Sequence, residues 1–115
     1  IGDRVLRALA GCCRAQVRHV DVVARYGGEE FVILLPEIDR QGALVVAERL
    51  RQAIERLVVP AGVDEHEAGA AVRLTVSIGV AALAPGHDLT SLLNLVDRTL
   101  YAAKQAGRNC VILGN

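Results

Sequence analysis

Two apolar runs flank a pair of glycines, Gly27 and Gly28, and this pattern limits the fold of the chain more than any other. The first run is DVVARY and the second is EEFVILLP, and both are rich in β-branched or aromatic residues, which favour strands. Both central positions of a tight hairpin turn need positive φ, which glycine adopts without steric cost. The sequence therefore predicts a β-hairpin over residues 21–36, ended by Pro36.

The rest of the chain alternates between helical and extended patterns. Apolar residues recur at helical spacing in three segments, and we expect helices at 3–17, 40–57 and 89–106. Segment 58–72 holds Pro60, glycines and a cluster of acids, which predict an exposed loop. The alternating segment 73–83 predicts a long strand, and NCVIL at 109–113 predicts the last strand. This order predicts one α/β (α+β) sandwich, with helices packed on a largely antiparallel sheet.

The composition fits one globular domain without a strong charge preference. A chain of 115 residues with 52% hydrophobic residues can bury a core of ordinary size. Its 13 basic and 13 acidic residues cancel. The net charge therefore predicts no binding to nucleic acid and no direct contact with a membrane surface.

Cysteine usage and the start of the chain indicate its cellular setting. Cys12, Cys13 and Cys110 have no metal-ligand spacing, and their odd number favours reduced thiols over a disulfide framework. No apolar run reaches the roughly 20 residues that span a bilayer, and no signal peptide opens the chain. We therefore expect a soluble cytoplasmic domain. Because it begins at Ile1 rather than Met, we also expect a longer parent protein, which could itself be membrane-anchored.

Two carboxylates, Glu29 and Glu30, follow the glycine pair at the tip of the predicted hairpin. A solvated turn would explain charges at such a tip without any function. However, neighbouring strand residues point to opposite faces, so one carboxylate must face whatever the glycines expose. Bare glycine backbone lets a nucleotide approach, and a carboxylate beside it suits Mg²⁺, which binds one or two carboxylates together with substrate phosphates. The residues alone leave both interpretations open.

Four segments together resemble one known family. They are RYGGEEF at 25–31, TVSIGVA at 75–81, DRTLYAAKQAGRN at 97–109 and GDRVLRALA at 2–10. Each is similar to a segment of the GGDEF family of diguanylate cyclases, here with the GGEEF variant of the signature. The resemblance implies a ferredoxin-like, nucleotidyl-cyclase-like fold, in which helices flank a mainly antiparallel central sheet. It also implies an enzyme that condenses two GTP molecules into cyclic di-GMP as a homodimer, each subunit presenting one GTP.

The resemblance also implies roles for individual residues of a nucleotide site. Glu29 would be the catalytic ligand of Mg²⁺ (or Mn²⁺) near the attacking hydroxyl, and Glu30 the adjacent metal-linked acid. The implied contacts to GTP come from Gly27 and Gly28, which leave room for the nucleotide, from Asp3, which bonds guanine, and from Lys104 and Arg108, which hold the triphosphate. Two alternatives remain: Asp3 as a helix N-cap, and the two cations as an ordinary basic helix end.

A second implied site lies upstream of the hairpin. Arg18 and Asp21 form an RxxD whose spacing from Gly27 resembles the family's inhibitory site, which binds the product cyclic di-GMP. Arg49 stands where the family often supplies another arginine to that site. A guanidinium suits this task because its planar fork binds phosphate or a guanine edge in bidentate fashion. On spacing alone, an ordinary surface ion pair is the alternative.

The chain departs from the family pattern at its start. Family members carry an earlier strand with a metal-binding aspartate, then an asparagine that holds guanine, and residues 1–115 contain neither. We therefore expect weak GTP binding and little turnover from these residues alone, and either pairing with another chain or an exposed sheet edge. We also expect a sensor domain in the parent chain.

The competing functions are an inactive domain that binds cyclic di-GMP or GTP as a regulatory module, and a structural dimerisation domain.

Overall fold

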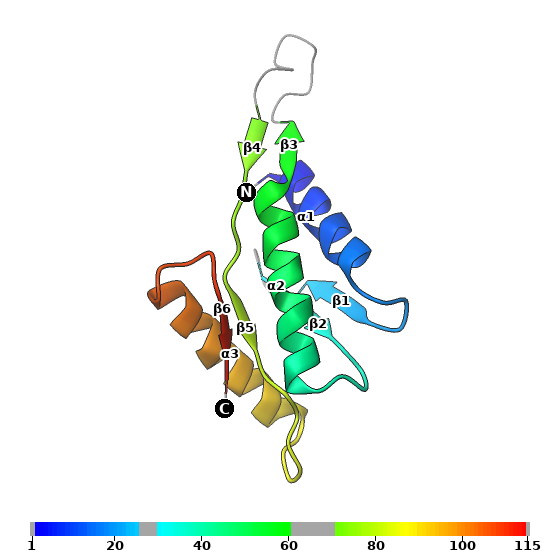
Figure 1. Cartoon of the computed structure of the whole chain (residues 1–115), viewed down its shortest axis with the longest axis vertical. Helices are drawn as coiled ribbons and strands as arrows, with labels where there is room; N and C mark the ends of the chain where they lie inside the picture. Colours follow the sequence, from blue (N-terminus) through cyan, green and yellow to red (C-terminus); the bar gives the residue numbers. More distant parts are fainter. Residues whose placement is uncertain (1, 26–29, 61–70, 115) are drawn as a thin grey trace.

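The computed structural model describes residues 2–25, 30–60 and 71–114, which form three helices and six strands (Figure 1). The helices are α1 (Asp3–Gln16), α2 (Arg40–Arg56) and α3 (Leu89–Gln105). The strands are β1 (Val22–Arg25), β2 (Phe31–Leu34), β3 (Val58–Pro60), β4 (Ala71–Arg73), β5 (Ile78–Val80) and β6 (Val111–Leu113). All three predicted helices are confirmed, with ends within one residue of those expected. None of these helices is long and apolar enough to cross a membrane, within the described residues.

Aspartates fix the points where α2 and α3 begin. The carboxylate of Asp39 accepts a hydrogen bond from the backbone N–H of Gly42 at 2.8 Å. Asp88 accepts one in the same way from Ser91 at 2.9 Å. These contacts satisfy backbone N–H groups that have no partner inside the helix. The residues directly before α2 and α3 therefore stabilise the first turns of these two helices through their side chains.

The predicted hairpin is formed by β1 and β2. The strands pair antiparallel, with Val22 opposite Leu34. Their side chains alternate in the way that the apolar pattern predicts: Val23 and Ile33 pack against the core, while Val22 and Leu34 are exposed. The tip of the hairpin, residues 26–29, lies outside the described residues.

The strand predictions beyond the hairpin are wrong in two places. Segment 58–72, predicted as a loop, begins with β3 and ends with the start of β4, which pair antiparallel, and residues 61–70 between them lie outside the described residues. Segment 73–83, predicted as one long strand, contains only the end of β4 and then β5, and residues 74–77 belong to no strand. Alternating side chains predict an extended chain, but they do not show whether a partner strand lies beside it.

The strands of the described residues form three two-stranded sheets instead of one continuous central sheet. The pairs β1–β2 and β3–β4 are antiparallel, and β5–β6 is parallel. The α+β class with mainly antiparallel pairing is thus confirmed. Strands β2 and β5 belong to different sheets, and no strand of the described part of the chain joins them.

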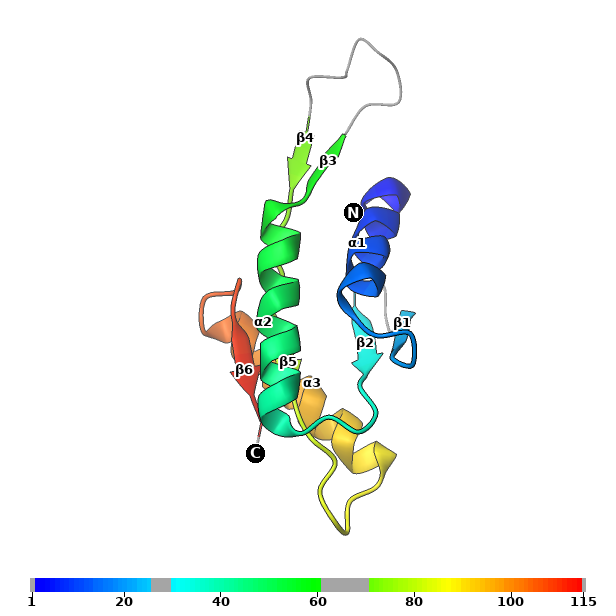
Figure 2. The ribbon, with the colours of Figure 1, turned by 45° about the vertical axis from the view of Figure 1, so that its right-hand side comes forward.

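The core sits between α1, α2 and the inner face of the hairpin. Leu9 and Cys13 of α1 pack with Leu50 and Ile54 of α2, and Ile54 is only 1% exposed. Desolvation by this burial raises the pKa of the Cys13 thiol to about 11, so the group stays neutral at ordinary pH. Helix α2 also contacts β5 and β6, on which α3 packs (Figure 2). The core helices therefore tie the hairpin to the C-terminal half of the chain.

Candidate functional site

A cavity of about 380 Å³ lies where the start of β2, the segment 74–78 and the end of α3 meet. Most of its lining is apolar and comes from the core, including Leu9 and Ile54. Three charged residues also line it: Glu30, Lys104 and Arg108. The cavity thus brings an acid from the hairpin together with two cations from the far end of the sequence.

Glu30 and Lys104 lie close to each other at this cavity. The Lys104 Nζ is 3.9 Å from the Glu30 Oε2, and the two side chains are 39% and 42% exposed. At this distance and exposure, solvent screens the attraction, so the pair contributes little to stability. Both charged groups therefore remain available to a ligand entering the cavity.

Arg108 lies in a left-handed turn after α3 and not on the helix face that the sequence predicts. The four-residue spacing of Lys104 and Arg108 predicts one helix face if the helix continues, but α3 ends at Gln105. The chain then turns through Gly107 at φ 115° and Arg108 at φ 62°. The Arg108 N–H donates to the Ala103 carbonyl at 3.2 Å, a bond typical of a helix end that turns left-handed. Both cations line the cavity nonetheless.

Asp3 lies in the first turn of α1, and the N-cap position belongs to Gly2. Asp3 is therefore a first-turn residue of α1 and not its N-cap, and no side chain caps this helix. Its carboxylate pairs with the Arg7 Nε at 3.0 Å on an exposed surface. A negative charge in the first turn also interacts favourably with the positive end of the helix dipole. Asp3 is not among the residues that line the cavity, so its contact with guanine remains a prediction.

The remaining predicted residues of the nucleotide site, Gly27, Gly28 and Glu29, fall outside the described residues. Within the ranges that are described, no group of three His, Cys, Asp or Glu side chains could hold a metal ion. Glu30 offers one carboxylate beside two cations, which is a partial fit to a magnesium–phosphate site, since Mg²⁺ takes one or two carboxylates with substrate phosphates. The metal site therefore stays a prediction.

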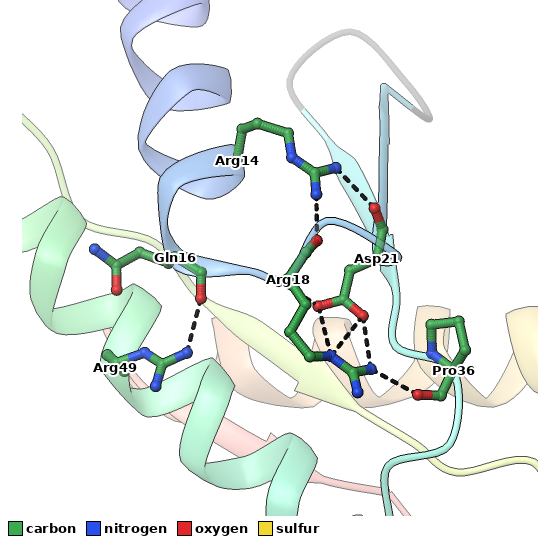
Figure 3. Close-up of polar contacts among 6 residues, drawn as sticks. All are labelled: Arg14, Gln16, Arg18, Asp21, Pro36 and Arg49. Carbon is green, nitrogen blue, oxygen red and sulfur yellow. Dashed lines mark hydrogen bonds and ion pairs between the residues drawn. The ribbon is translucent and has the colours of Figure 1, made fainter.

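The RxxD residues contact each other directly at the C-terminal end of α1 (Figure 3). The Arg18 Nη2 lies 2.7 Å from the Asp21 Oδ1, and the Arg18 backbone N–H donates to the Asp21 Oδ2 at 2.7 Å. The Asp21 side chain is 1% exposed, whereas that of Arg18 is 45% exposed. The hydrogen bond from the guanidinium is the main cause that lowers the pKa of Asp21. The pair is therefore more than an ion pair between two surface side chains.

Neighbouring groups hold this turn in place. Arg14 donates to the Asp21 carbonyl at 2.7 Å and to the Arg18 carbonyl. The Arg18 Nη2 also donates to the carbonyl of Pro36, just after β2, at 2.6 Å. None of these three contacts is predicted from the sequence; a basic residue in the last turn of a helix is the signal that points to Arg14.

Arg49 reaches the same end of α1 but binds a different group. Its Nη2 donates to the Gln16 carbonyl at 2.7 Å, so it satisfies one of the free carbonyls of the helix end (Figure 3). The structure thus brings Arg18 and Asp21 into contact in the turn after α1, and it places Arg49 at the end of α1 that precedes them. A joint role of the three in binding a ligand remains a prediction.

Comparison with known proteins gives consistent matches along nearly the whole chain. The family model "Diguanylate cyclase, GGDEF domain" matches residues 1–110. Diguanylate cyclase DosC of Escherichia coli is 40% identical over 113 residues, which cover 97% of this chain and 23% of the relative. Diguanylate cyclase DgcP of Pseudomonas aeruginosa is 38% identical over 108 residues, covering 94% of this chain and 15% of the relative.

Solved structures agree with the sequence matches. Diguanylate cyclase SiaD from Pseudomonas aeruginosa, in complex with its activator SiaC, superposes with a TM-score of 0.86 at 34% identity, covering 97% of this chain and 41% of that one. The GGDEF domain of DgcB from Caulobacter crescentus, in complex with c-di-GMP, superposes with a TM-score of 0.86 at 28% identity, covering 96% and 63% of the two chains.

The chain matches only part of the length of each relative. The chain spans 15% to 29% of the first three curated relatives, so they match it through one of their parts. The matched family model covers residues 1–110, and the superposed structures reproduce the arrangement of helices and strands described above. The chain belongs to the GGDEF domain family of diguanylate cyclases.

Proposed function

We propose that this domain is the catalytic domain of a diguanylate cyclase, which condenses two GTP molecules into cyclic di-GMP. One observation carries the proposal: Glu30, Lys104 and Arg108 line the same cavity although Glu30 is far from the other two in the sequence. An acid that can bind metal beside two cations that can bind phosphate is the combination that phosphoryl transfer requires. The curated relatives named diguanylate cyclase support the same reaction.

Each residue has a defined part in this proposal. Lys104 and Arg108 bind the triphosphate and orient its α-phosphate for in-line attack. Glu29 and Glu30 hold Mg²⁺ or Mn²⁺, which when bound neutralises charge on the phosphates. Gly27 and Gly28 let the nucleotide approach the backbone, and Asp3 accepts hydrogen bonds from the guanine edge. The attacking 3′-hydroxyl comes from a second GTP, so two subunits must face each other as a homodimer.

We further propose that a strand from outside residues 1–115 completes this site. Two observations support it: β2 and β5 each pair with only one described strand, and residues of both line a second cavity of about 700 Å³ that extends toward the starts of α2 and α3. The two cavities share Ile33, Leu50 and Ile78, so they form one apolar groove, which we call the β2–β5 groove. Open strand edges beside apolar side chains favour the addition of a strand.

The catalytic proposal is tested by incubating the parent protein with GTP and Mg²⁺ and measuring cyclic di-GMP by chromatography. We expect product from the wild type, and a rate lower by at least about a hundredfold for Glu29→Gln and for Lys104→Ala, since each removes a group that stabilises charge on the phosphates. Arg98→Ala, which removes an exposed cation from the same helix as Lys104, is the matched control and should retain the rate. A parent protein that makes no cyclic di-GMP would refute the proposal.

A regulatory module that binds cyclic di-GMP without making it is the second candidate. The observation that favours it is the Arg18–Asp21 pair, which is held by Arg14 and Pro36 independently of the cavity. In the leading proposal these same residues, with Arg49, form a product site that inhibits the cyclase. Both candidates therefore predict binding of cyclic di-GMP, and only the GTP assay separates them.

Calorimetry with cyclic di-GMP tests the product site itself. Arg18→Ala should weaken binding by roughly tenfold or more, because it removes a charged hydrogen-bond donor. Arg98→Ala is again the control for loss of one positive charge. If Arg18→Ala binds cyclic di-GMP as tightly as the wild type, the assignment of this site is wrong.

A further inference from the structure

Three consecutive residues after α3 have left-handed backbone angles. They are Gly107 at φ 115°, Arg108 at φ 62° and Asn109 at φ 45°. Glycine tolerates this region, but a residue with a Cβ is strained there unless surrounding contacts hold it. Arg108, which lines the cavity, is therefore presented by a backbone conformation that needs support from elsewhere.

The support comes from the side chain of Asn109. Its Oδ1 accepts a hydrogen bond from the Arg51 Nη1 at 2.9 Å, and its Nδ2 donates to the Glu55 Oε2 at 2.6 Å. Both partners lie on α2, more than fifty positions earlier in the sequence. The amide of Asn109 thus has a donor contact and an acceptor contact on one rigid helix.

Arg51 is itself fixed before it reaches Asn109. The Glu48 Oε1 accepts hydrogen bonds from the Arg51 Nε at 3.0 Å and from its Nη2 at 2.5 Å, and the Glu48 Oε2 accepts one from the Nε at 3.1 Å. The Arg51 side chain is only 16% exposed, and its hydrogen bond is the main cause that lowers the pKa of Glu48. The guanidinium is therefore a fixed anchor, and its remaining Nη1 is directed to Glu55 and Asn109.

Stability alone does not account for this network. Glu48 and Glu55 are 45% and 47% exposed, and ion pairs with partners this exposed add little to folding. The network does, however, fix the residue directly after Arg108. Asn is also among the few non-glycine residues that adopt the left-handed region readily. We therefore interpret the network as a means of fixing the backbone conformation at Arg108.

We propose that Asn109, anchored by Arg51 and Glu55, is a positioning residue that holds Arg108 against the cavity for contact with the nucleotide phosphates. This inference rests on the proposed binding of GTP by Arg108. Asn109 makes no contact with the nucleotide in this account; it acts through the backbone of the residue before it.

The test measures the affinity of the parent protein for a GTP analogue whose α,β-phosphate bond cannot be cleaved, by calorimetry. Asn109→Gly keeps a residue that tolerates positive φ but removes the anchor, so we expect affinity to fall roughly fivefold. Arg51→Gln should cause a similar loss. Arg56→Gln, which removes an exposed cation from the same helix, is the matched control and should bind as the wild type does.

A double-mutant cycle with Arg108→Ala separates positioning from general destabilisation. If Asn109 acts through Arg108, Asn109→Gly should change affinity by less than about twofold in the Arg108→Ala background. An equal loss in both backgrounds, or no loss in either, overturns the inference. If Arg108→Ala alone leaves affinity unchanged, the phosphate role of Arg108 fails instead, which is a failure of the proposed function. A folding defect would lower affinity in both backgrounds and therefore counts against positioning.

Discussion

Asp21 is a buried ionisable residue whose surroundings change its pKa. Its carboxylate is almost fully buried, and its pKa is lowered chiefly by the hydrogen bond from Arg18. A carboxyl whose pKa is lower in the folded state stabilises the fold above its ordinary value of 3.8, and this contribution is lost as the pH falls through the lowered folded value. Acid should therefore weaken the turn that joins α1 to β1.

Denaturant unfolding between about pH 2 and pH 7 tests this residue. Asp21→Asn should be less stable than the wild type at neutral pH, and the difference should shrink as the pH falls below 3.8. Asp3→Asn is the control, since its exposed partner Arg7 adds little. A difference between Asp21→Asn and wild type that stays constant across this range would contradict the assignment.

At the residue scale, side chains at motif positions are predictable from the sequence, whereas those that bind backbone groups or a distant helix are not. Glu30, Lys104 and Arg108 are recognisable from the signature segments, and the structure places them at one cavity. Arg14 was not predicted because its partners are carbonyl groups, which every residue carries. Asn109 was not predicted because its partners lie on a distant helix and only the fold brings them together.

The contact between β5 and α3 depends on the absence of a side chain at Gly79. A Cβ at this position would lie 2.5 Å from the Leu100 backbone nitrogen, so the strand and the helix would have to move apart. Gly79→Ala should therefore destabilise the protein by about 1–3 kcal/mol, the usual cost of overpacking. Gly11→Ala is the matched control, because no atom lies within 4 Å of its Cβ position.

Thermal or denaturant unfolding of these two variants checks the prediction. Gly11 lies in the interior of α1, where alanine favours the helix by about 0.5–1 kcal/mol, so this control should be slightly stabilised. The same glycine-to-alanine substitution should therefore raise the stability at Gly11 and lower it at Gly79. Equal effects at Gly11 and Gly79 would show that close packing of β5 on α3 does not limit residue size.

Helices were more predictable than strands in this chain, for a physical reason. A helix satisfies its own hydrogen bonds, so the apolar period and a capping residue such as Asp39 or Asp88 define it locally. A strand needs a partner. The pairing of β3 with β4 joins segments on either side of residues 61–70, and β5 pairs in parallel with β6 across the whole of α3. Neither partner can be read from local alternation.

At the scale of the whole molecule, the β2–β5 groove is the feature that the described residues leave open. It combines apolar walls with two unpaired strand edges, which is a surface that associates readily. Residues 1–115 expressed alone should therefore self-associate or bind an apolar dye, as light scattering and fluorescence would show. A dye-free monomer at all concentrations tested would contradict the proposed missing strand.

The most direct test of the account compares the rate of cyclic di-GMP formation by the parent protein with that of residues 1–115 alone, at equal concentration with GTP and Mg²⁺. We propose that the described cavity is one part of a site that a further strand completes. We therefore expect product from the parent protein and little or none from residues 1–115. Equal rates from the two would show that the site needs no further strand, and no product from either would refute the proposed cyclase activity.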